Sequence, residues 1–310
     1  MARPTLIAKA LEVVLTATRM LPPRFAFWAG GVLGWWFGHL PMRDQRRARA
    51  NLKRAFPERD AAWVERTTGH CFRHFGRMAL WSIATVTLPP RRLLRSIVFE
   101  GRENLKDLMR AGRGGQGTVL FTGHYGNWEV MARVGALIVP LSVIGKRLRN
   151  PQLDALVVRI RESGGARVLY QEEDVRTLVR ELRGGRTLCT LADQDIPRLP
   201  GIHVPWFGIP AYTPVAPAAL VMLGGGHVQA VFCFAHGGRW VMHLSPRRHI
   251  PRGSDRDAAI RTITTWITAY EEALVRRHPE QWVWWHLRWR TQPPAAAPLA
   301  AVSASGAAGR

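Results

Sequence analysis

The segment TVLFTGHYGNWEVMARVGAL, residues 118–137, holds three patterns in succession. Thr118 to Thr122 is a short, mainly apolar run, which predicts a buried strand. Gly123 and Gly126 give the following stretch the backbone freedom that a tight turn needs. Asn127 to Leu137 then predicts a helix. A strand, a turn and a helix in this order form the unit from which parallel sheets are built.

The same alternation continues on both sides of this segment. Further helices are expected over residues 61–80, 103–111, 151–162, 172–182, 214–223 and 255–277. Further strands are expected over residues 96–100, 141–144, 167–170, 186–191, 228–234 and 240–244. The chain is therefore predicted to have an α/β fold, with a mainly parallel central sheet flanked by helices on both faces.

The composition is strongly basic. The 310 residues include 44 Lys and Arg against 22 Asp and Glu, a formal net charge of +22. Such a surface attracts polyanions, whether nucleic acid, anionic lipid or an acidic protein. The three cysteines have no paired spacing, which argues against a disulfide framework and against a cysteine-rich zinc site. A reducing, cytoplasmic setting is the simplest interpretation.

The N-terminal region indicates lipid among these partners. Phe25 to Met42 contains Trp and Gly but no formally charged residue, and its length of about 18 residues is near the lower limit for a membrane span. Arg43 to Arg54 follows as a basic cluster. This combination predicts a hydrophobic helical membrane anchor that grips anionic lipid. A buried hairpin of core helices is the alternative, and basic residues at both ends leave open whether the anchor spans the membrane or lies on it.

His124 and Glu129 are the candidate catalytic pair. On one continuous helix they would point about 140° apart. With His124 in the turn and Glu129 inside the helix, the two side chains can meet. A neutral imidazole accepts a proton from an alcohol, and a carboxylate on its other nitrogen fixes the tautomer. Since the sequence has no G-x-S-x-G motif, the nucleophile is expected to be a substrate hydroxyl attacking an activated acyl group.

Two other interpretations of His124 remain. A single histidine at a strand end can be purely structural. A zinc site would require H-E-x-x-H or further His and Cys residues close in sequence, and the chain has no such pattern, so no metal is expected.

Four stretches, taken together, carry a family resemblance. They are NLKRAFPE (51–58), GHYGNWE (123–129), ADQD (192–195) with VPWFGIPAYTPVAPAAL (204–220), and PEQWVWWHLRWRTQP (279–293). In this order they resemble the lysophospholipid acyltransferase superfamily and, within it, the bacterial lipid A biosynthesis (lauroyl/myristoyl) acyltransferases. GHYGNWE is similar to the H-x4-[DE] block of that family.

The resemblance implies roles for individual residues. His124 would be the general base and Glu129 its partner. Lys146 or Arg147 would contact a phosphate or an oxyanion, although relatives usually have arginine where Lys146 stands. The implied substrate-binding residues are Asn127, Lys146, Arg147, Asp193, Gln194 and Asp195. The two aspartates would orient a sugar hydroxyl or hold arginines, or else merely cap a strand end. Phe207 to Pro210 would line an acyl channel or form an ordinary core turn.

The resemblance also implies a domain plan. Residues 1–56 would form the membrane-associated helical segment, residues 57–292 the acyltransferase domain, and the low-complexity residues 293–310 a disordered tail.

The expected function is that of a membrane-associated O-acyltransferase on the cytoplasmic face of a bacterial inner membrane. Acyl carrier protein or coenzyme A would bring the acyl chain as a thioester, with no further cofactor. A lipid A precursor or related anionic glycolipid would accept it. Phosphatidylinositol mannoside or another phospholipid or glycolipid is the alternative acceptor. A non-catalytic membrane- or nucleic-acid-binding protein is the alternative from another class, but no nucleic-acid-binding motif is present and no nucleic-acid partner is expected.

Overall fold

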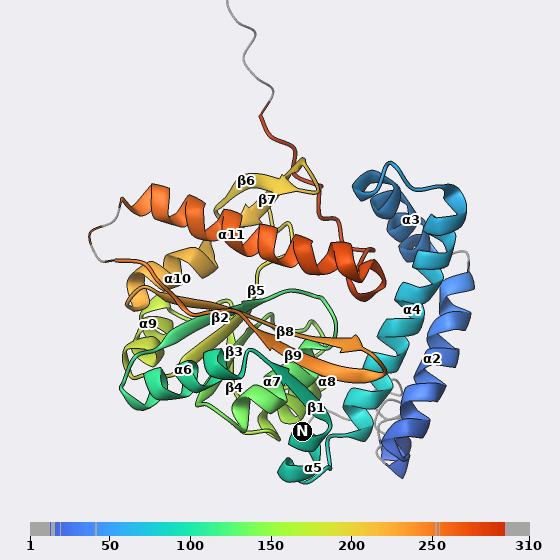
Figure 1. Cartoon of the computed structure of the whole chain (residues 1–310), viewed down its shortest axis with the longest axis horizontal. Helices are drawn as coiled ribbons and strands as arrows, with labels where there is room; N and C mark the ends of the chain where they lie inside the picture. Colours follow the sequence, from blue (N-terminus) through green and yellow to red (C-terminus); the bar gives the residue numbers. More distant parts are fainter. Residues whose placement is uncertain are drawn as a thin grey trace, which may run out of the picture.

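The computed structural model describes residues 13, 16–18, 20–40, 42–251, 253 and 255–294 (Figure 1). Its centre is a sheet with the strand order β1-β9-β8-β2-β5-β3-β4, in which the short β10 also pairs with β8. The strands are β1 (Ile97–Glu100), β2 (Thr118–Thr122), β3 (Leu141–Gly145), β4 (Arg167–Tyr170), β5 (Thr187–Leu191), β8 (His227–His236), β9 (Arg239–Leu244) and β10 (Arg248–His249).

The sheet is mainly parallel. β2 pairs in parallel with β5 on one side and β8 on the other, and β3 pairs in parallel with β5 and β4. β9 runs antiparallel to β8 and parallel to β1. The predicted fold class, an α/β protein with a mainly parallel sheet, is therefore confirmed.

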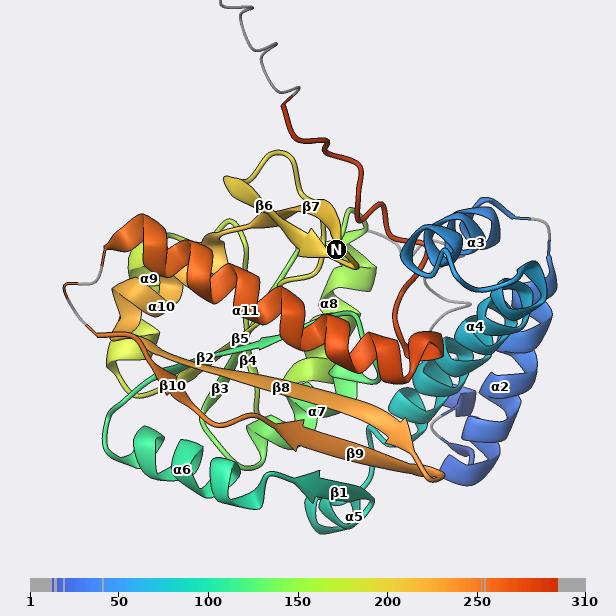
Figure 2. The same cartoon turned by 45° about the horizontal axis from the view of Figure 1, so that its top comes forward.

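Helices cover both faces of the sheet. They are α5 (Pro90–Arg95), α6 (Arg102–Arg113), α7 (Trp128–Ala136), α8 (Pro151–Glu162), α9 (Val175–Arg183), α10 (Ala216–Gly224) and α11 (Arg256–Arg277), the last followed by a short 3-10 turn at Pro279–Gln281. α10 and α11 lie on one side of the sheet, and α6 and α7 lie on the other (Figure 2).

The strand β2 brings the opening segment to the middle of the sheet. All five of its residues are buried, as expected of a strand paired on both edges. The predicted turn and helix follow it. Gly126 has a φ of 64° and supplies the left-handed residue, and the Asn127 side chain accepts a hydrogen bond from the Val130 amide at 3.1 Å and caps α7.

The sequence-based assignment lacks the short α5 and β10, and it also lacks a hairpin. β6 (Gly201–Trp206) and β7 (Ile209–Pro214) form an antiparallel hairpin on the outer side of α11 (Figure 1). Its two turn residues, Phe207 and Gly208, have φ values of 53° and 73°, as in a type I′ turn. Prolines at 205, 210 and 214 interrupt the usual strand pattern, which hides the hairpin from periodicity.

The N-terminal helices form a separate layer at one edge of the sheet. α2 (Pro23–His39) lies alongside α4 (Ala61–Ala84), and α3 (Arg43–Ala55) joins them (Figures 1 and 2). Glycines make this contact close: a Cβ added to Gly30 would lie 2.2 Å from the carbonyl oxygen of Gly76, and one on Gly34 would lie 2.2 Å from that of Phe72.

Because glycines face α4, the large side chains of α2 point outward. Its exposed apolar residues are Phe25, Trp28, Val32, Leu33, Trp35, Trp36 and Phe37. In the described part of the chain, no helix combines the length and the apolar character that a membrane crossing requires. With 17 residues, α2 extends roughly 26 Å, less than the hydrocarbon core of a bilayer. A membrane-spanning anchor is therefore not supported.

The predicted C-terminal tail lies, from residue 295 onward, outside the described residues.

Candidate active site

Two neighbouring parallel strands bring His124 and Asp193 together. His124 follows β2, and Asp193 follows β5, whose Leu191 pairs with Thr122. The amide of Ala192 donates to the carbonyl of Thr122 at 3.0 Å and continues this pairing beyond the strands. Residues 69 positions apart therefore meet at the carboxyl edge of the sheet, where open α/β sheets bind ligands.

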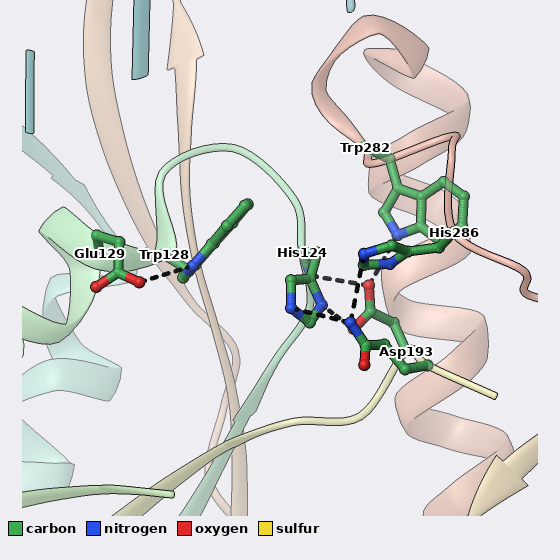
Figure 3. Close-up of polar contacts among 7 residues, drawn as sticks. His124, Trp128, Glu129, Asp193, Trp282 and His286 are labelled. Atoms are coloured by element: carbon green, nitrogen blue, oxygen red, sulfur yellow. Dashed lines mark hydrogen bonds and ion pairs between the residues drawn. The ribbon is translucent and has the colours of Figure 1, made fainter. Parts of the chain in front are cut away.

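His124 and Asp193 make two hydrogen bonds (Figure 3). The imidazole Nδ1 of His124 lies 2.8 Å from Oδ1 of Asp193, and the backbone amide of His124 donates to Oδ2 at 2.8 Å. The indole Nε1 of Trp282 also donates to Oδ2, at 3.0 Å. Asp193 is thus fixed by three donors from two separate segments.

These donors keep Asp193 ionised. Burial alone would raise the pKa of its carboxyl group, but the charge and hydrogen bond of His124 outweigh burial and hold the pKa well below its usual value. A carboxylate only accepts hydrogen bonds, so the Nδ1 atom of His124 carries the proton. The lone pair on Nε2 is then available as a base. The side chain of His124 remains 21% exposed, while that of Asp193 is 1% exposed.

The expected contact between His124 and Glu129 is wrong. Glu129 lies in the first turn of α7, but its carboxylate pairs with the guanidinium of Arg161 on α8, at 2.6 and 3.0 Å. The indole of Trp128 also donates to Glu129 at 3.1 Å, and its ring packs 5.1 Å from the ring of His124. Trp128 therefore lies between the two residues (Figure 3). Asp193 takes the position that was expected for Glu129.

A second histidine lies beside the first. The rings of His124 and His286 are 4.7 Å apart, edge to face. The side-chain amide nitrogen of Gln194 lies 3.3 Å from Nε2 of each ring. Burial, reinforced by the nearby charge of His124, lowers the pKa of His286 to about 4. His286 is therefore neutral at pH 7, and the side-chain amide of Gln194 lies between the Nε2 atoms of the two rings.

The remaining residues from the sequence prediction lie in different places. Asn127 has no exposed surface, because its side chain caps α7 and accepts a hydrogen bond from Ser82 at 3.0 Å, so it does not reach a substrate. Arg147 stacks over the Tyr170 ring at 3.7 Å. Asp195 accepts from the amide and the hydroxyl of Thr291 at 2.6 and 2.7 Å, which fastens the C-terminal segment.

A cavity of about 870 Å³ opens onto His124. This volume is within the range of small-molecule sites. Its polar lining includes Gln194, Asp195 and Lys146. Its apolar lining comes from α7, β3, α8, β4, α9 and α10: Met131, Val143, Val157, Val168, Leu178 and Leu220.

Phe207 is not part of this lining. It packs against Phe56 and Trp284, at ring distances of 5.0 and 5.9 Å, on the outer side of α11. Of the two interpretations of Phe207 to Pro210, the structure therefore favours the turn, because Phe207 packs in the core and none of the four residues lines the cavity at His124.

His124, Asp193 and His286 also form a cluster of metal-ligand types. Their ligand atoms lie within 4.8 Å of one another. The sequence shows no metal-ligand residues close to His124 along the chain, but the fold brings Asp193 and His286 next to it. Both oxygens of Asp193 already accept hydrogen bonds, and Nδ1 of His124 is one of the donors. The cluster therefore fits a hydrogen-bonded acid–base site better than a metal centre.

Sequence reasoning missed Trp282, His286 and Arg161 as parts of this region. Trp282 and His286 belong to the stretch PEQWVWWHLRWRTQP, which in the sequence supported only the family resemblance. That stretch was the available signal for both residues. Arg161 is one of two arginines on α8, and nothing local distinguishes it.

Comparisons with known proteins point to acyltransferases. A family model described as "Bacterial lipid A biosynthesis acyltransferase" matches residues 5–291. A phosphatidylinositol mannoside acyltransferase of Mycobacterium tuberculosis is 26% identical over 76% of this chain and 73% of its own length. A lipid A biosynthesis palmitoleoyltransferase of Escherichia coli is 24% identical over 81% of this chain and 80% of its own.

Among solved structures, the 1-acyl-sn-glycerophosphate acyltransferase of Thermotoga maritima is similar with a TM-score of 0.37 and 12% identity, covering 76% of this chain and 99% of that one. This similarity is too low to support a conclusion.

Proposed function

The chain belongs to the bacterial lipid A biosynthesis acyltransferase family and is an acyltransferase, and from this premise we propose that it transfers a fatty acyl chain from a thioester to a hydroxyl group of a lipid A precursor or related glycolipid. The observation that carries the proposal is His124, whose Nδ1 is held by Asp193, whose Nε2 contacts Gln194, and whose side chain lines a largely apolar cavity. A base beside an apolar cavity suits a reaction between an alcohol and a fatty acyl group.

The reaction proceeds by direct transfer. The acceptor hydroxyl donates to Nε2 of His124, which takes the proton as the oxygen attacks the thioester carbonyl carbon. Asp193 stabilises the imidazolium that forms. The carbon–sulfur bond then breaks, and the leaving thiolate takes the proton from His124. Cys189 also lines the cavity, but burial raises its pKa to about 12, so its thiol is a poor nucleophile at neutral pH.

Cations in the cavity suit anionic substrates. Lys146, Arg198 and Arg290 line it and are exposed. Its carboxylates already have partners: Glu129 pairs with Arg161, Asp154 accepts from Tyr170 and Leu148, and Asp195 accepts from Thr291. Lys146 and Arg198 are therefore available for the phosphate of acyl carrier protein or coenzyme A, and for a phosphorylated acceptor, while Arg290 also donates to the backbone carbonyl of Asp195 at 3.3 Å.

Phosphatidylinositol mannoside is the second candidate acceptor. The mycobacterial relatives that are named for this activity match at 26% identity over 76% of the chain. Both acceptors carry hydroxyl groups on an anionic lipid, so the same base and the same cations serve either.

The site of action is proposed to be a membrane surface, the cytoplasmic face of a bacterial inner membrane. The exposed aromatic residues of α2 suit the interfacial layer of a bilayer, and the adjacent α3 carries five arginines and one lysine in the sequence RDQRRARANLKRA. A surface-bound helix requires no membrane crossing.

A single-turnover assay tests the function. Purified protein is mixed with radiolabelled acyl-carrier-protein or acyl-coenzyme A thioester, and with either a lipid A precursor or phosphatidylinositol mannoside. We expect a labelled lipid product with one acceptor, lost in His124→Ala and retained in a control, His70→Ala, whose residue is exposed on α4. No labelled product with any donor and acceptor pair, or full activity in a folded His124→Ala variant, would contradict the proposal.

A further inference from the structure

A second carboxyl group is buried beneath the His124–Asp193 pair. Glu271 projects from α11 and is 2% exposed, as is Asp193. It also touches the turn that carries the base: a Cβ added to Gly123 would lie 1.7 Å from Oε1 of Glu271. The residue before His124 is therefore a glycine because the Glu271 carboxyl group occupies the space of a side chain.

The two carboxyl groups have unequal hydrogen-bond partners. Asp193 accepts from the amide and the imidazole of His124 and from the indole of Trp282. Oε1 of Glu271 is buried and has no hydrogen-bond partner among the described residues. Two adjacent buried carboxylates repel each other, so one of them keeps its proton. The negative charge resides on Asp193, which has the donors.

Charge balance favours the same assignment. Arg288 is 1% exposed and acts electrostatically on both Asp193 and Glu271. Its guanidinium is fixed by the carbonyl of Tyr212 and the hydroxyl of Thr213, each at 2.8 Å. One buried cation balances one buried anion, and a second carboxylate would be uncompensated.

We propose that Glu271 is a neutral carboxylic acid that positions Asp193 from beneath and thereby holds His124 in its catalytic orientation. The proposal deepens the proposed function, and it rests on that function for the role of His124. Burial, and next the charge of Asp193, raise the pKa of Glu271 well above its usual value, while Arg288 opposes this shift. The charged and titratable groups around this set include Asp193, Asp195, Arg288, Tyr125, His124 and His286.

Infrared spectroscopy tests the protonation state independently of activity. At neutral pH the purified wild-type protein is expected to show a protonated-carboxyl C=O band that is absent in Glu271→Gln. Asp257→Asn, which removes an exposed carboxylate from the same helix, should keep the band. A wild-type spectrum without the band, or a band unchanged in Glu271→Gln, overturns the proposal.

Kinetics test the positioning role. Glutamine mimics a neutral acid, so Glu271→Gln should keep kcat within about threefold and leave the acid limb of kcat/KM at the same pH. Glu271→Leu keeps bulk but removes the carboxyl group that packs against Gly123, and kcat should fall about tenfold with KM unchanged.

Two kinetic results would overturn this role. If Glu271 is ionised in the wild type, Glu271→Gln removes a negative charge near protonated His124 and moves the acid limb to lower pH. A folded Glu271→Leu enzyme with wild-type kcat also contradicts positioning. If Glu271→Leu does not fold, the infrared band and the glutamine variant still decide. Failure of the acyltransferase assay, by contrast, would not affect the infrared test of Glu271 protonation. It would contradict only the role of Glu271 in catalysis.

Discussion

At the scale of single residues, the orientation of His124 is determined by Asp193. Two hydrogen bonds of 2.8 Å join them, and one of these reaches the backbone of His124. Glu129 instead neutralises Arg161 at the wall of the cavity. In the H-x4-E motif, His124 is therefore the candidate base and Glu129 is a residue that lines the cavity. The carboxylate that contacts His124 is Asp193, which follows β5.

The first prediction compares the two carboxylates. Asp193→Asn leaves the shape of the site but no longer fixes the tautomer of His124, so kcat should fall by at least about a hundredfold. Glu129→Gln keeps a hydrogen bond to Arg161 and should lose less. Steady-state kinetics of both variants, with circular dichroism as a folding control, provide the comparison. A larger loss for Glu129→Gln than for Asp193→Asn would restore the His124–Glu129 pairing.

The second prediction concerns His74, which is buried on α4. Burial lowers its pKa to about 4, partly opposed by the bond of Nε2 to the carbonyl of Gly126. A histidine that is harder to protonate when folded stabilises the fold fully above about pH 6.5, and this contribution is lost as the pH falls towards 4. The free energy of unfolding should fall by up to about 1.4 kcal/mol per pH unit from this residue.

A difference measurement isolates His74. His286 contributes with the same sign and Glu271 with the opposite sign, but both are present in the wild type and in His74→Gln. Urea unfolding of both proteins between pH 6.5 and 4 should show a shallower decline for the variant. Parallel curves would mean that His74 is already accessible to protons in the folded protein.

At the scale of elements, α2 packs with its apolar side chains outward. The cause is the glycine contact with α4, which leaves no space for side chains between the two helices. Gly76 of α4 shows how tight this contact is, because a Cβ there would lie 2.1 Å from the carbonyl oxygen of Gly30. Glycine on both helices thus decides which face of α2 is exposed.

The third prediction compares two glycines of α4. Gly76→Ala forces the helices apart and should destabilise the protein by about 1–3 kcal/mol. Gly69→Ala meets only the His39 ring at 3.8 Å, and since alanine favours helix by about 1 kcal/mol over glycine, stability should not fall. Thermal unfolding of both variants measures the difference. Equal melting temperatures would show that the α2–α4 contact adjusts without cost.

At the scale of the whole molecule, the exposed apolar face of α2 and the basic α3 lie in one layer beside the sheet (Figure 2). Trp28 and Trp36 are each 61% exposed. Burial of apolar surface contributes about 25 cal/mol per Å². We therefore propose that this face contacts anionic lipid.

The fourth prediction is that this face binds membranes. Trp28→Ser with Trp36→Ser should weaken partition onto vesicles with anionic lipid by at least about tenfold. Val175→Ser, which removes an exposed apolar side chain on α9, is the matched control and should bind as the wild type does. Flotation with anionic vesicles measures both. If the double variant floats as well as the wild type, α2 does not form the membrane contact.

The sequence by itself determined the elements around β2 and their order. A buried strand, a turn with Gly126 and a capped helix are local patterns, and the alternation of such units implies a parallel sheet. It also identified His124, because the carboxyl end of a buried strand is a local position.

Only the tertiary structure decided which carboxylate His124 contacts. Asp193 reaches it because β5 lies next to β2 in the sheet, an adjacency of strands that lie far apart in the chain. The hairpin β6–β7 and the outward face of α2 likewise depend on what packs against them. Local patterns depend on neighbours along the chain, whereas hydrogen-bond partners and exposed faces depend on which distant segments come within a few ångströms.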